Sequence, residues 1–297
     1  MSPSIETTPW ERENFAYCEA LLRAADKDRF LACLFVPRHA RPGLYALYAF
    51  NVEAMRVRDV VSDPLPGEMR LQWWRDALEG NGHGDVQRHP VAAALMAAMG
   101  RHGLPVTALQ NYLEARVFDL YDDAMPSLAD LEGYAGETVS ILMQLAALTI
   151  DPETANSAAR AAGHCGVALA ITHILRSFPK HAARGQVYLP LDVLEEHGVT
   201  REEVLSGQTG PRLSAALATL RAHAREHIDK ARRELPDVHP NVAPALLPAA
   251  LARPYLDKME DDDYDPFRSV VDLPQWRRQW ILWVSARRAR RGAIGRR

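Results

Sequence analysis

Residues 158–175 read AARAAGHCGVALAITHIL, and this stretch indicates the fold class. It is apolar on most sides and rich in alanine and glycine, which suits a helix that packs closely inside a core. Residues 140–150, SILMQLAALTI, have the same character. Alternating polar and apolar patterns of useful length are absent, and residues 186–189 are the only short candidate for a strand. The sequence therefore predicts an all-α protein with these two stretches as core helices.

Signals for helix ends recur along the rest of the chain. Thr8 and Pro9 with Glu11 are typical of a helix start, and so is Ser127 with Asp130 three residues later. Residues that break helices fall about a helix length apart, at Pro37, 62–67, 80–90, 103–105, 179–185, 206–211 and 236–248. We expect roughly ten helices around a central cavity or core. They would form one domain over residues 11–285, between a short extension (1–10) and a basic tail (286–297).

The composition excludes several classes of protein. The chain has 297 residues, of which 47% are apolar and 25% charged, so it can bury a core and is not intrinsically disordered. Its three cysteines, Cys18, Cys33 and Cys165, form no CxxC motif and are expected to be reduced, with Cys165 a buried, inert thiol. No apolar run approaches the roughly 18 residues of a membrane span, and the first residues lack the features of a signal peptide. We therefore expect a cytoplasmic protein.

The formal net charge of −3 is unevenly distributed. Residues 276–297 contain eight arginines and no acidic residue, which leaves −11 on the rest of the chain. A body with that charge repels polyanions, so we expect no nucleic acid partner.

The basic end also contains tryptophans at near-helical spacing. Trp276, Trp280 and Trp283 are followed by Arg287 and Arg288. Amphipathic helices with this composition favour the membrane interface, where arginines meet anionic lipids. We expect these residues to make peripheral contact with the inner face of the cytoplasmic membrane. The alternative is a last helix that packs its tryptophans on the core.

A histidine pair offers a possible metal site. His223, Glu226 and His227 form the HxxEH pattern, whose histidines lie on one helix face and could bind Zn²⁺ in a hydrolase. The segment contains no evident third ligand. Its many charged neighbours favour a solvated helix face, so we expect no metal there.

Acidic residues gather in two further places. Asp119, Asp122 and Asp123 would lie on one helix and, with a second facing helix, could hold Mg²⁺ on a diphosphate; the alternative is a solvated helix end. Residues 260–265, EDDDYD, lack the spacing of an EF-hand loop. We expect a solvated loop there, or a contact with basic residues such as those of the tail.

Several segments carry a resemblance to a known family. They are FLACLFVP (30–37) with PGLYALYAF (42–50), LEGYAGETV (131–139), and GVALAITHILR (166–176) with RGQVYLP (184–190). In this order, over roughly residues 14–285, the chain resembles the squalene/phytoene synthase family. The resemblance implies an isoprenoid synthase fold with a central cavity. Active members join two prenyl diphosphates, with Mg²⁺ held by two aspartate-rich motifs.

Both implied metal motifs have lost carboxylates. The first falls on Met55, Arg56 and Asp59, and only its last acid remains. The second falls on Ser177 and His181, and neither acid remains. Because ionisation of an allylic diphosphate needs cations between phosphate and carboxylates, we expect no catalytic residue and no cofactor.

Cationic residues stand near the same positions. A family asparagine falls on His173, and a family serine that helps to hold diphosphate falls on Asp28. Arg56, Arg58 and Lys180 could instead bind an anion directly, without metal. The candidates for cavity or ligand contact are Asp28, Tyr48, Asn51, Glu53, Arg56, Asp59, Arg116, Asp119, Asp123, His173, Arg176 and Tyr188.

Further segments resemble one branch of this family. They are NVE (51–53), RDVVS (58–62), MRLQWWR (69–75), SFPKH (177–181), VYLPLD (187–192) and HGV (197–199). That branch is non-catalytic, has bacterial members and acts in assembly of respiratory complex I (NADH:quinone oxidoreductase). The resemblance implies a role in complex I assembly, with a complex I subunit or assembly protein as partner, or a role as a scaffold that binds a lipid or prenyl ligand. The alternative is an active prenyltransferase, with Mg²⁺ and a site rewired around Asp59, Asp119 and Asp123.

Overall fold

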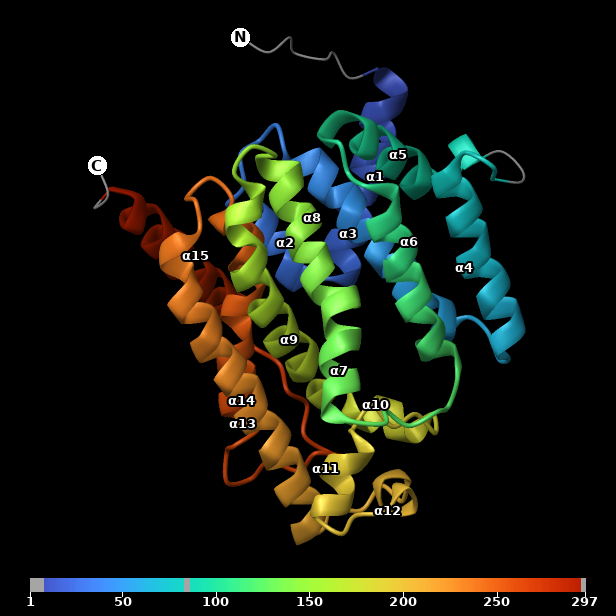
Figure 1. The fold of residues 1–297 in the computed structure, drawn as a ribbon, viewed down its shortest axis with the longest axis vertical. Coiled ribbons are helices and arrows are strands. Elements are labelled where there is room, and N and C mark those ends of the chain that lie inside the picture. Colours follow the sequence, from blue (N-terminus) through green and yellow to red (C-terminus); the bar gives the residue numbers. More distant parts are fainter. Residues whose placement is uncertain (1–7, 83–85, 295–297) are drawn as a thin grey trace.

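The computed structural model describes residues 8–82 and 86–294, and every regular element within them is a helix (Figure 1). This confirms the predicted all-α class. The first half of the chain forms α1 (Pro9–Ala25), α2 (Lys27–Cys33), α3 (Arg41–Arg56), η1 (Val57–Asp59), α4 (Pro64–Glu79), η2 (Val86–Arg88), α5 (Pro90–His102), α6 (Val106–Ala115), η3 (Arg116–Leu120), α7 (Leu128–Ala135), η4 (Gly136–Ser140) and α8 (Ile141–Ile150). The second half forms η5 (Ala155–Ala158), α9 (Ala159–Arg176), α10 (Phe178–Ala183), α11 (Leu191–Glu196), α12 (Arg201–Leu205), α13 (Pro211–Glu234), η6 (Leu235–Asp237), η7 (Ala243–Leu251), α14 (Ala252–Lys258) and α15 (Gln275–Ile294).

The predicted helix starts are confirmed by their caps. The Thr8 hydroxyl accepts a hydrogen bond from the Glu11 amide, and the Glu11 carboxylate accepts one from the Thr8 amide. Ser127 caps α7 through its hydroxyl, which accepts a hydrogen bond from the Asp130 amide. Such caps satisfy amide groups that have no partner inside the helix.

α8 and α9 are the core helices that the sequence predicts. α9 packs against α13, α8 and the π-helical turn η4. Gly166 on α9 makes the close approach to η4 possible, because a Cβ atom there would lie 2.1 Å from the Ser140 hydroxyl oxygen. Packing of backbone this close explains why the stretch is rich in small residues.

Residues 155–176 differ from one expectation. By length and composition they could cross a membrane, with a mean hydropathy of 1.2 over the 18-residue window. The expectation that no stretch approaches a membrane span is therefore wrong by this criterion. However, 72% of that window is buried inside the protein, as in the core helix of a globular protein.

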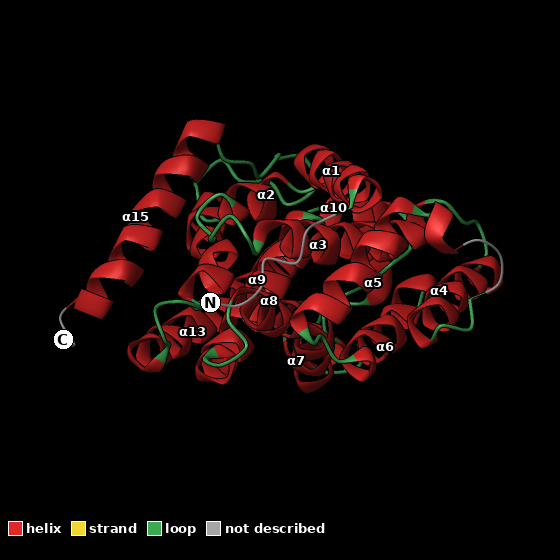
Figure 2. Cartoon of the chain, turned by 90° about the horizontal axis from the view of Figure 1, so that it is seen from above, coloured by secondary structure: helices red, strands yellow, loops and turns green. Residues whose placement is uncertain are grey.

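The remaining helices lie on two sides of α8 and α9. On one side α1, α3 and α5 pack together, with α4 and α6 beyond them. On the other side α15 lies at the outer edge, against η7 and α2 (Figure 2). α15 runs through the boundary expected between residues 285 and 286, so the last part of the domain and the start of the basic tail are one element.

The acidic stretch after α6 is not the expected helix. η3 ends at Leu120, and Asp122 and Asp123 lie in the connection that follows. Pro126 disfavours helical geometry just before it. Asp119, Asp122 and Asp123 therefore do not share a helix face.

The stretch around residues 179–189 also differs from expectation. Residues 178–183 form α10 where a break was expected, because Pro179 stands in the first turn and needs no amide partner there. Residues 186–189 do not form a strand. They are held by the Met125 amide, which donates to the Val187 carbonyl at 3.0 Å.

Candidate functional site

A cavity of about 860 Å³ lies between the end of α9, α10 and the ends of α2, α3 and η3. Tyr134 of α7, residues 269–272 and Arg278 of α15 complete its wall. Its volume falls in the usual range for small-molecule sites, about 300–1,000 Å³.

Most of the expected ligand residues line this cavity. Nine of the twelve do so: Asp28, Asn51, Arg56, Asp59, Arg116, Asp119, His173, Arg176 and Tyr188. The remaining positions of the two implied metal motifs, Met55, Ser177 and His181, line it as well. The structure thus brings the two motif segments to one cavity from α3–η1 and α9–α10.

Three expected residues do not line the cavity. Tyr48 is buried, and the Arg29 guanidinium lies 5.6 Å from its ring. Glu53 is half-buried on α3, and Asp123 is exposed after η3.

Asp59 joins the two motif segments directly. Its carboxylate forms ion pairs with Lys180, at 3.2 Å, and with Arg184. Although partial burial acts in the opposite direction, the hydrogen bonds from Arg184 and Lys180 lower the pKa of Asp59. We call Asp59, Lys180 and Arg184 the Asp59 cluster. Its carboxylate charge is already matched by two protein cations.

Asp119 is enclosed by donors. The hydroxyl groups of Tyr134 and Tyr188 each donate to its Oδ1 atom at 2.7 Å, and Arg116 donates to Oδ2 at 3.0 Å. Arg116 is buried and also donates to the Tyr112 hydroxyl at 3.1 Å. This carboxylate is therefore satisfied by the protein itself.

Two histidines of the cavity are neutral. Burial lowers the pKa of His181 to about 4, and it lowers the pKa of His173 as well. The His181 ring contacts the Tyr188 ring, with 4.6 Å between centroids. Neither histidine adds charge to the cavity near neutral pH.

Asp28 lies among cations where the family resemblance implies a serine. It accepts a hydrogen bond from the Tyr255 hydroxyl at 2.7 Å and forms ion pairs with Arg278 at 3.0 Å and Arg176 at 3.8 Å. Burial raises the pKa of Asp28 despite these partners. Arg278 also pairs with Asp272, so one residue of α15 closes this side of the cavity.

The cavity wall is positively charged. It contains nine lysine or arginine residues and five aspartates. Within the described residues, Arg56 has no carboxylate partner, while Arg58 pairs with the exposed Asp122 at 3.1 Å. The surplus of cations suits an anionic ligand bound without a metal.

Sequence reasoning missed four of these residues. Arg184 and Tyr134 lie inside segments that carried the family resemblance, but they are not part of its metal motifs. Tyr255 lies outside every motif, and Arg278 was considered only as one of the eight arginines of residues 276–297. The pairing of charges across the cavity would have required knowledge of the fold.

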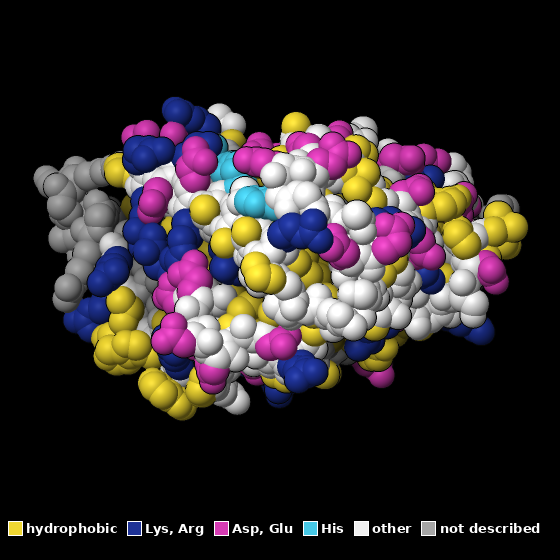
Figure 3. Space-filling model, turned by 90° about the horizontal axis from the view of Figure 1, so that it is seen from below, with side chains coloured by type: hydrophobic (Ala, Val, Ile, Leu, Met, Phe, Trp, Pro, Cys, Tyr) yellow, Lys and Arg dark blue, Asp and Glu magenta, His cyan; other side chains and the backbone are white. Residues whose placement is uncertain are grey.

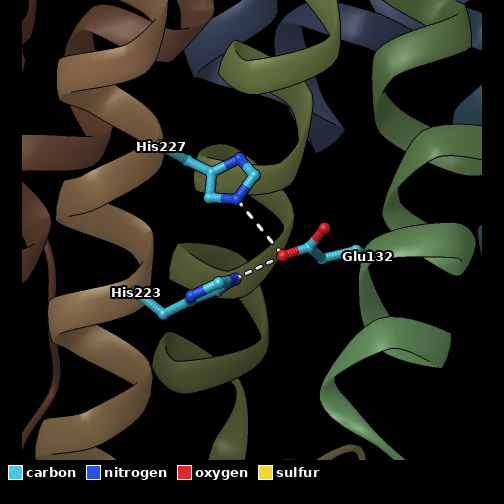
Figure 4. Close-up of side chains that lie close together, drawn as sticks. All are labelled: Glu132, His223 and His227. Carbon is cyan, nitrogen blue, oxygen red and sulfur yellow. Dashed lines mark hydrogen bonds and ion pairs between the residues drawn. The ribbon is translucent and has the colours of Figure 1, made fainter.

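A second cluster lies on the outer side of α7. His223 and His227 of α13 meet Glu132 of α7 (Figure 4). The expectation of a solvated helix face is wrong for His227, which is 4% exposed. Glu132, the third residue of this cluster, was not found from the sequence because it lies on another helix.

The acidic run 260–265 contacts basic residues, as one interpretation held. Glu260 pairs with Arg225 at 2.7 Å and with Arg221 at 3.8 Å, both on α13. Glu260 therefore contacts α13, and the prediction that the acidic run contacts the basic tail is wrong for this residue. Residues 295–297 and the side chains beyond residue 289 lie outside the described part.

The tryptophans of α15 face outward. Trp276, Trp280 and Trp283 are 68%, 60% and 43% exposed, whereas Leu282 is fully buried against the body. The alternative in which the tryptophans pack on the core is therefore wrong. Arg287 lies over the Trp283 ring, and Arg288 is exposed. Figure 3 shows hydrophobic side chains among lysines and arginines on the side where the chain ends.

Comparisons with known proteins agree with this architecture. A family model described as squalene/phytoene synthase matches residues 22–283. A solved dehydrosqualene synthase superposes with a TM-score of 0.79 at 21% identity, over 94% of this chain and 98% of that one. A squalene synthase from Alicyclobacillus acidocaldarius superposes with a TM-score of 0.72 at 23% identity, over 88% and 98%. The chain therefore has the isoprenoid synthase fold.

Curated relatives carry two kinds of name. A Rattus norvegicus protein named NADH dehydrogenase (ubiquinone) complex I, assembly factor 6, is 34% identical over 97% of this chain and 86% of its own length. Its Homo sapiens counterpart is 33% identical over 84% of this chain and 75% of its own length. A phytoene synthase from Arthrospira platensis is 25% identical over 97% of each chain.

Proposed function

Because this chain belongs to the squalene/phytoene synthase family, we propose that it uses the fold of that family without its chemistry, as a non-catalytic factor in assembly of respiratory complex I. The names of the rat and human relatives support the assembly role. The cavity geometry supports the loss of catalysis.

The Asp59 cluster is the observation that carries this proposal. Metal-assisted departure of a diphosphate requires carboxylates that hold Mg²⁺ against phosphate oxygens. Asp59 instead pairs with Lys180 and Arg184, and the carboxylate of Asp119 is occupied by Arg116 and two tyrosines. These residues do not fit a Mg²⁺ cage.

The cavity would bind an anionic lipid or prenyl compound directly. Arg56 and Arg58 line the cavity from α3 and η1, and Lys180 and Arg184 line it from α10 and the turn that follows. A phosphate group between them would be held by charge-assisted hydrogen bonds. The neutral His181 and Met55 would contact the less polar part of the ligand.

α15 would hold the protein at the cytoplasmic membrane. Its exposed tryptophans can enter the headgroup region of the inner leaflet, and Arg287 and Arg288 can pair with anionic lipids. The protein would then work beside complex I subunits as they enter the membrane.

Two measurements test the proposal. Purified protein with Mg²⁺ and farnesyl or geranylgeranyl diphosphate should form no squalene, presqualene diphosphate or phytoene. In the host cell, deletion of the gene should lower the amount of assembled complex I on native gels and leave other respiratory complexes unchanged. Product formation, or normal complex I after deletion, would overturn it.

The second candidate is an active prenyltransferase with a rewired site. The similarity to the Arthrospira platensis phytoene synthase and the position of Asp119 in the cavity favour it. Of the acids proposed for such a site, Asp123 lies outside the cavity, which leaves Asp59 and Asp119. This candidate requires Mg²⁺-dependent turnover that Asp119→Asn abolishes; inactivity of the wild type rules it out.

A further inference from the structure

Glu132, His223 and His227 form a cluster that the proposed function does not use. The Glu132 Oε1 atom lies 2.6 Å from His223 Nε2 and 3.3 Å from His227 Nε2. The ligand atoms of all three residues lie within 4.8 Å of one another. Figure 4 shows the two imidazoles pointing from α13 toward the carboxylate on α7.

The two histidine side chains of the cluster are largely buried, and the cluster is open to solvent on the side of Glu132. The side chains of His227 and His223 are 5% and 16% exposed, and that of Glu132 is 39% exposed. The spacing of four residues places both histidines on one face of α13. A small ion could therefore reach ligand atoms that are themselves held by packing.

We propose that Glu132, His223 and His227 bind a zinc-class divalent metal ion, with water or an external ligand in the fourth position. Two histidines and one glutamate form a common donor set for zinc sites with one open position. Bond lengths of about 2.0–2.1 Å put neighbouring tetrahedral ligand atoms about 3.3 Å apart. The separation of Glu132 and His227 already has this value, and that of Glu132 and His223 requires an opening of about 0.7 Å.

His164 of α9 supplies the support that a metal-bound histidine needs. Its Nδ1 atom lies 3.3 Å from the Nδ1 atom of His227. With a metal on Nε2, the His227 Nδ1 atom carries a hydrogen and donates it to His164, which fixes the ring. Burial lowers the pKa of both histidines, in keeping with neutral rings.

A metal at this point would join α7 to α13. Glu132 lies two residues before Tyr134, whose hydroxyl donates to Asp119 in the cavity. The same helix would thus be fixed by the metal on its outer side and by Asp119 on its inner side. The metal-free alternative is a hydrogen-bonded cluster in which Glu132 accepts from both imidazoles.

Zinc titration of the full-length, tag-free protein distinguishes the two arrangements. After treatment with a chelator, the wild type should bind about one zinc ion per chain in competition with a chromophoric chelator. Cobalt should give the visible absorption of a tetrahedral site. Glu132→Gln, which keeps size and hydrogen bonding, should weaken zinc binding by more than about 100-fold, and His164→Asn by about 10–100-fold.

Asp229→Asn is the matched control. Asp229 lies on α13 two residues after His227, and its carboxylate pairs with Arg232 and Arg253, each at 3.3 Å, rather than with a histidine. This variant should bind zinc as the wild type does. Equal zinc affinity of the wild type and Glu132→Gln, or a wild type without a tetrahedral cobalt spectrum, would overturn the proposal. The cobalt spectrum of the wild type decides the matter even where a variant fails to fold.

Discussion

At the scale of single residues, Asp59 determines the character of the cavity. It is the one acid left from two metal motifs, and it contacts cations that come from the other motif's helix and the turn after it. Removal of its charge leaves Lys180 and Arg184 without this partner. The effect on anion binding and the effect on folding can be measured separately.

Asp59→Asn should tighten binding of inorganic pyrophosphate by roughly fivefold, about 1 kcal/mol, because two cations become free to bind it. Folding stability should change by less than about 1 kcal/mol, since the ion pairs are partly exposed. Calorimetric titration at constant ionic strength measures the first effect. Asp229→Asn removes an ion-paired acid on α13 and should leave binding unchanged. Unchanged binding by Asp59→Asn would show that the cavity is not the anion site.

His181 makes stability depend on pH. Because burial lowers its pKa from 6.5 to about 4, the folded protein takes up a proton less readily than the unfolded chain. The stabilising contribution is present above pH 6.5 and is lost as the pH falls toward 4. Between pH 7 and 4 the free energy of unfolding should fall by on the order of 3 kcal/mol through this residue.

His181→Phe keeps a ring against Tyr188 but cannot take up a proton. Denaturant unfolding at several pH values should show a smaller loss of stability on acidification than in the wild type. Parallel pH profiles of the two proteins would contradict this assignment.

At the scale of helices, α9 and η4 can pack closely because Gly166 has no side chain. Gly166→Ala would put a Cβ atom 2.1 Å from the Ser140 hydroxyl and 2.5 Å from its backbone. We expect a loss of about 3 kcal/mol in the free energy of unfolding, because both elements must move.

Gly163→Ala is the control on the same helix. Apart from its chain neighbours and the backbone of its own helix, no atom lies within 4 Å of the added Cβ, so the higher helix propensity of alanine should stabilise the protein by up to about 1 kcal/mol. Thermal or denaturant unfolding measures both variants. A stable Gly166→Ala variant would mean that the two elements are less closely packed than described.

Helices and their ends could be predicted because the signals are local. The cap at Thr8, the apolar stretch of α9 and the proline and glycine breaks all act within a few residues. The prediction failed at Asp122 and Asp123, where contacts of Asp119 with other elements and a nearby proline end the helix early. Spacing along the chain alone carries no information about such contacts.

The candidate site could be predicted only in part. Two segments led to the cavity because they carry a family resemblance, and nine of twelve candidate residues line it. The partners of these residues, such as Arg184, Tyr134 and Tyr255, come from elements that only folding brings near. For the same reason, the sequence could not show that Glu132 lies next to His223 and His227.

At the scale of the whole molecule, the uneven distribution of charge should orient the protein relative to an anionic membrane. The acidic body should be repelled by an anionic bilayer, and the outward face of α15 should be attracted to it. Arg287→Gln together with Arg288→Gln should weaken binding to vesicles with anionic lipid by about 2 kcal/mol, roughly 30-fold. Sedimentation at low salt measures this.

Binding should also weaken as salt is raised, and vesicles of neutral lipid should bind much less protein. Trp276→Ser should reduce binding to vesicles. Trp10→Ser is the control: Trp10 is also exposed, at 44%, but it lies on α1 and not on α15, so this change should not reduce binding. Equal effects of the two tryptophan changes would contradict an orientation through α15.

The Asp59 cluster also restricts the order in which mutations could restore metal binding. A carboxylate introduced at Met55 or His181 alone would enter a wall with nine cationic side chains, and these would neutralise it before a metal ion could. The cations must be lost first, at a stage when the new metal-binding carboxylates are not yet present to benefit. A mutational path back to a synthase therefore passes through intermediates that gain nothing, which makes the present charge arrangement self-preserving.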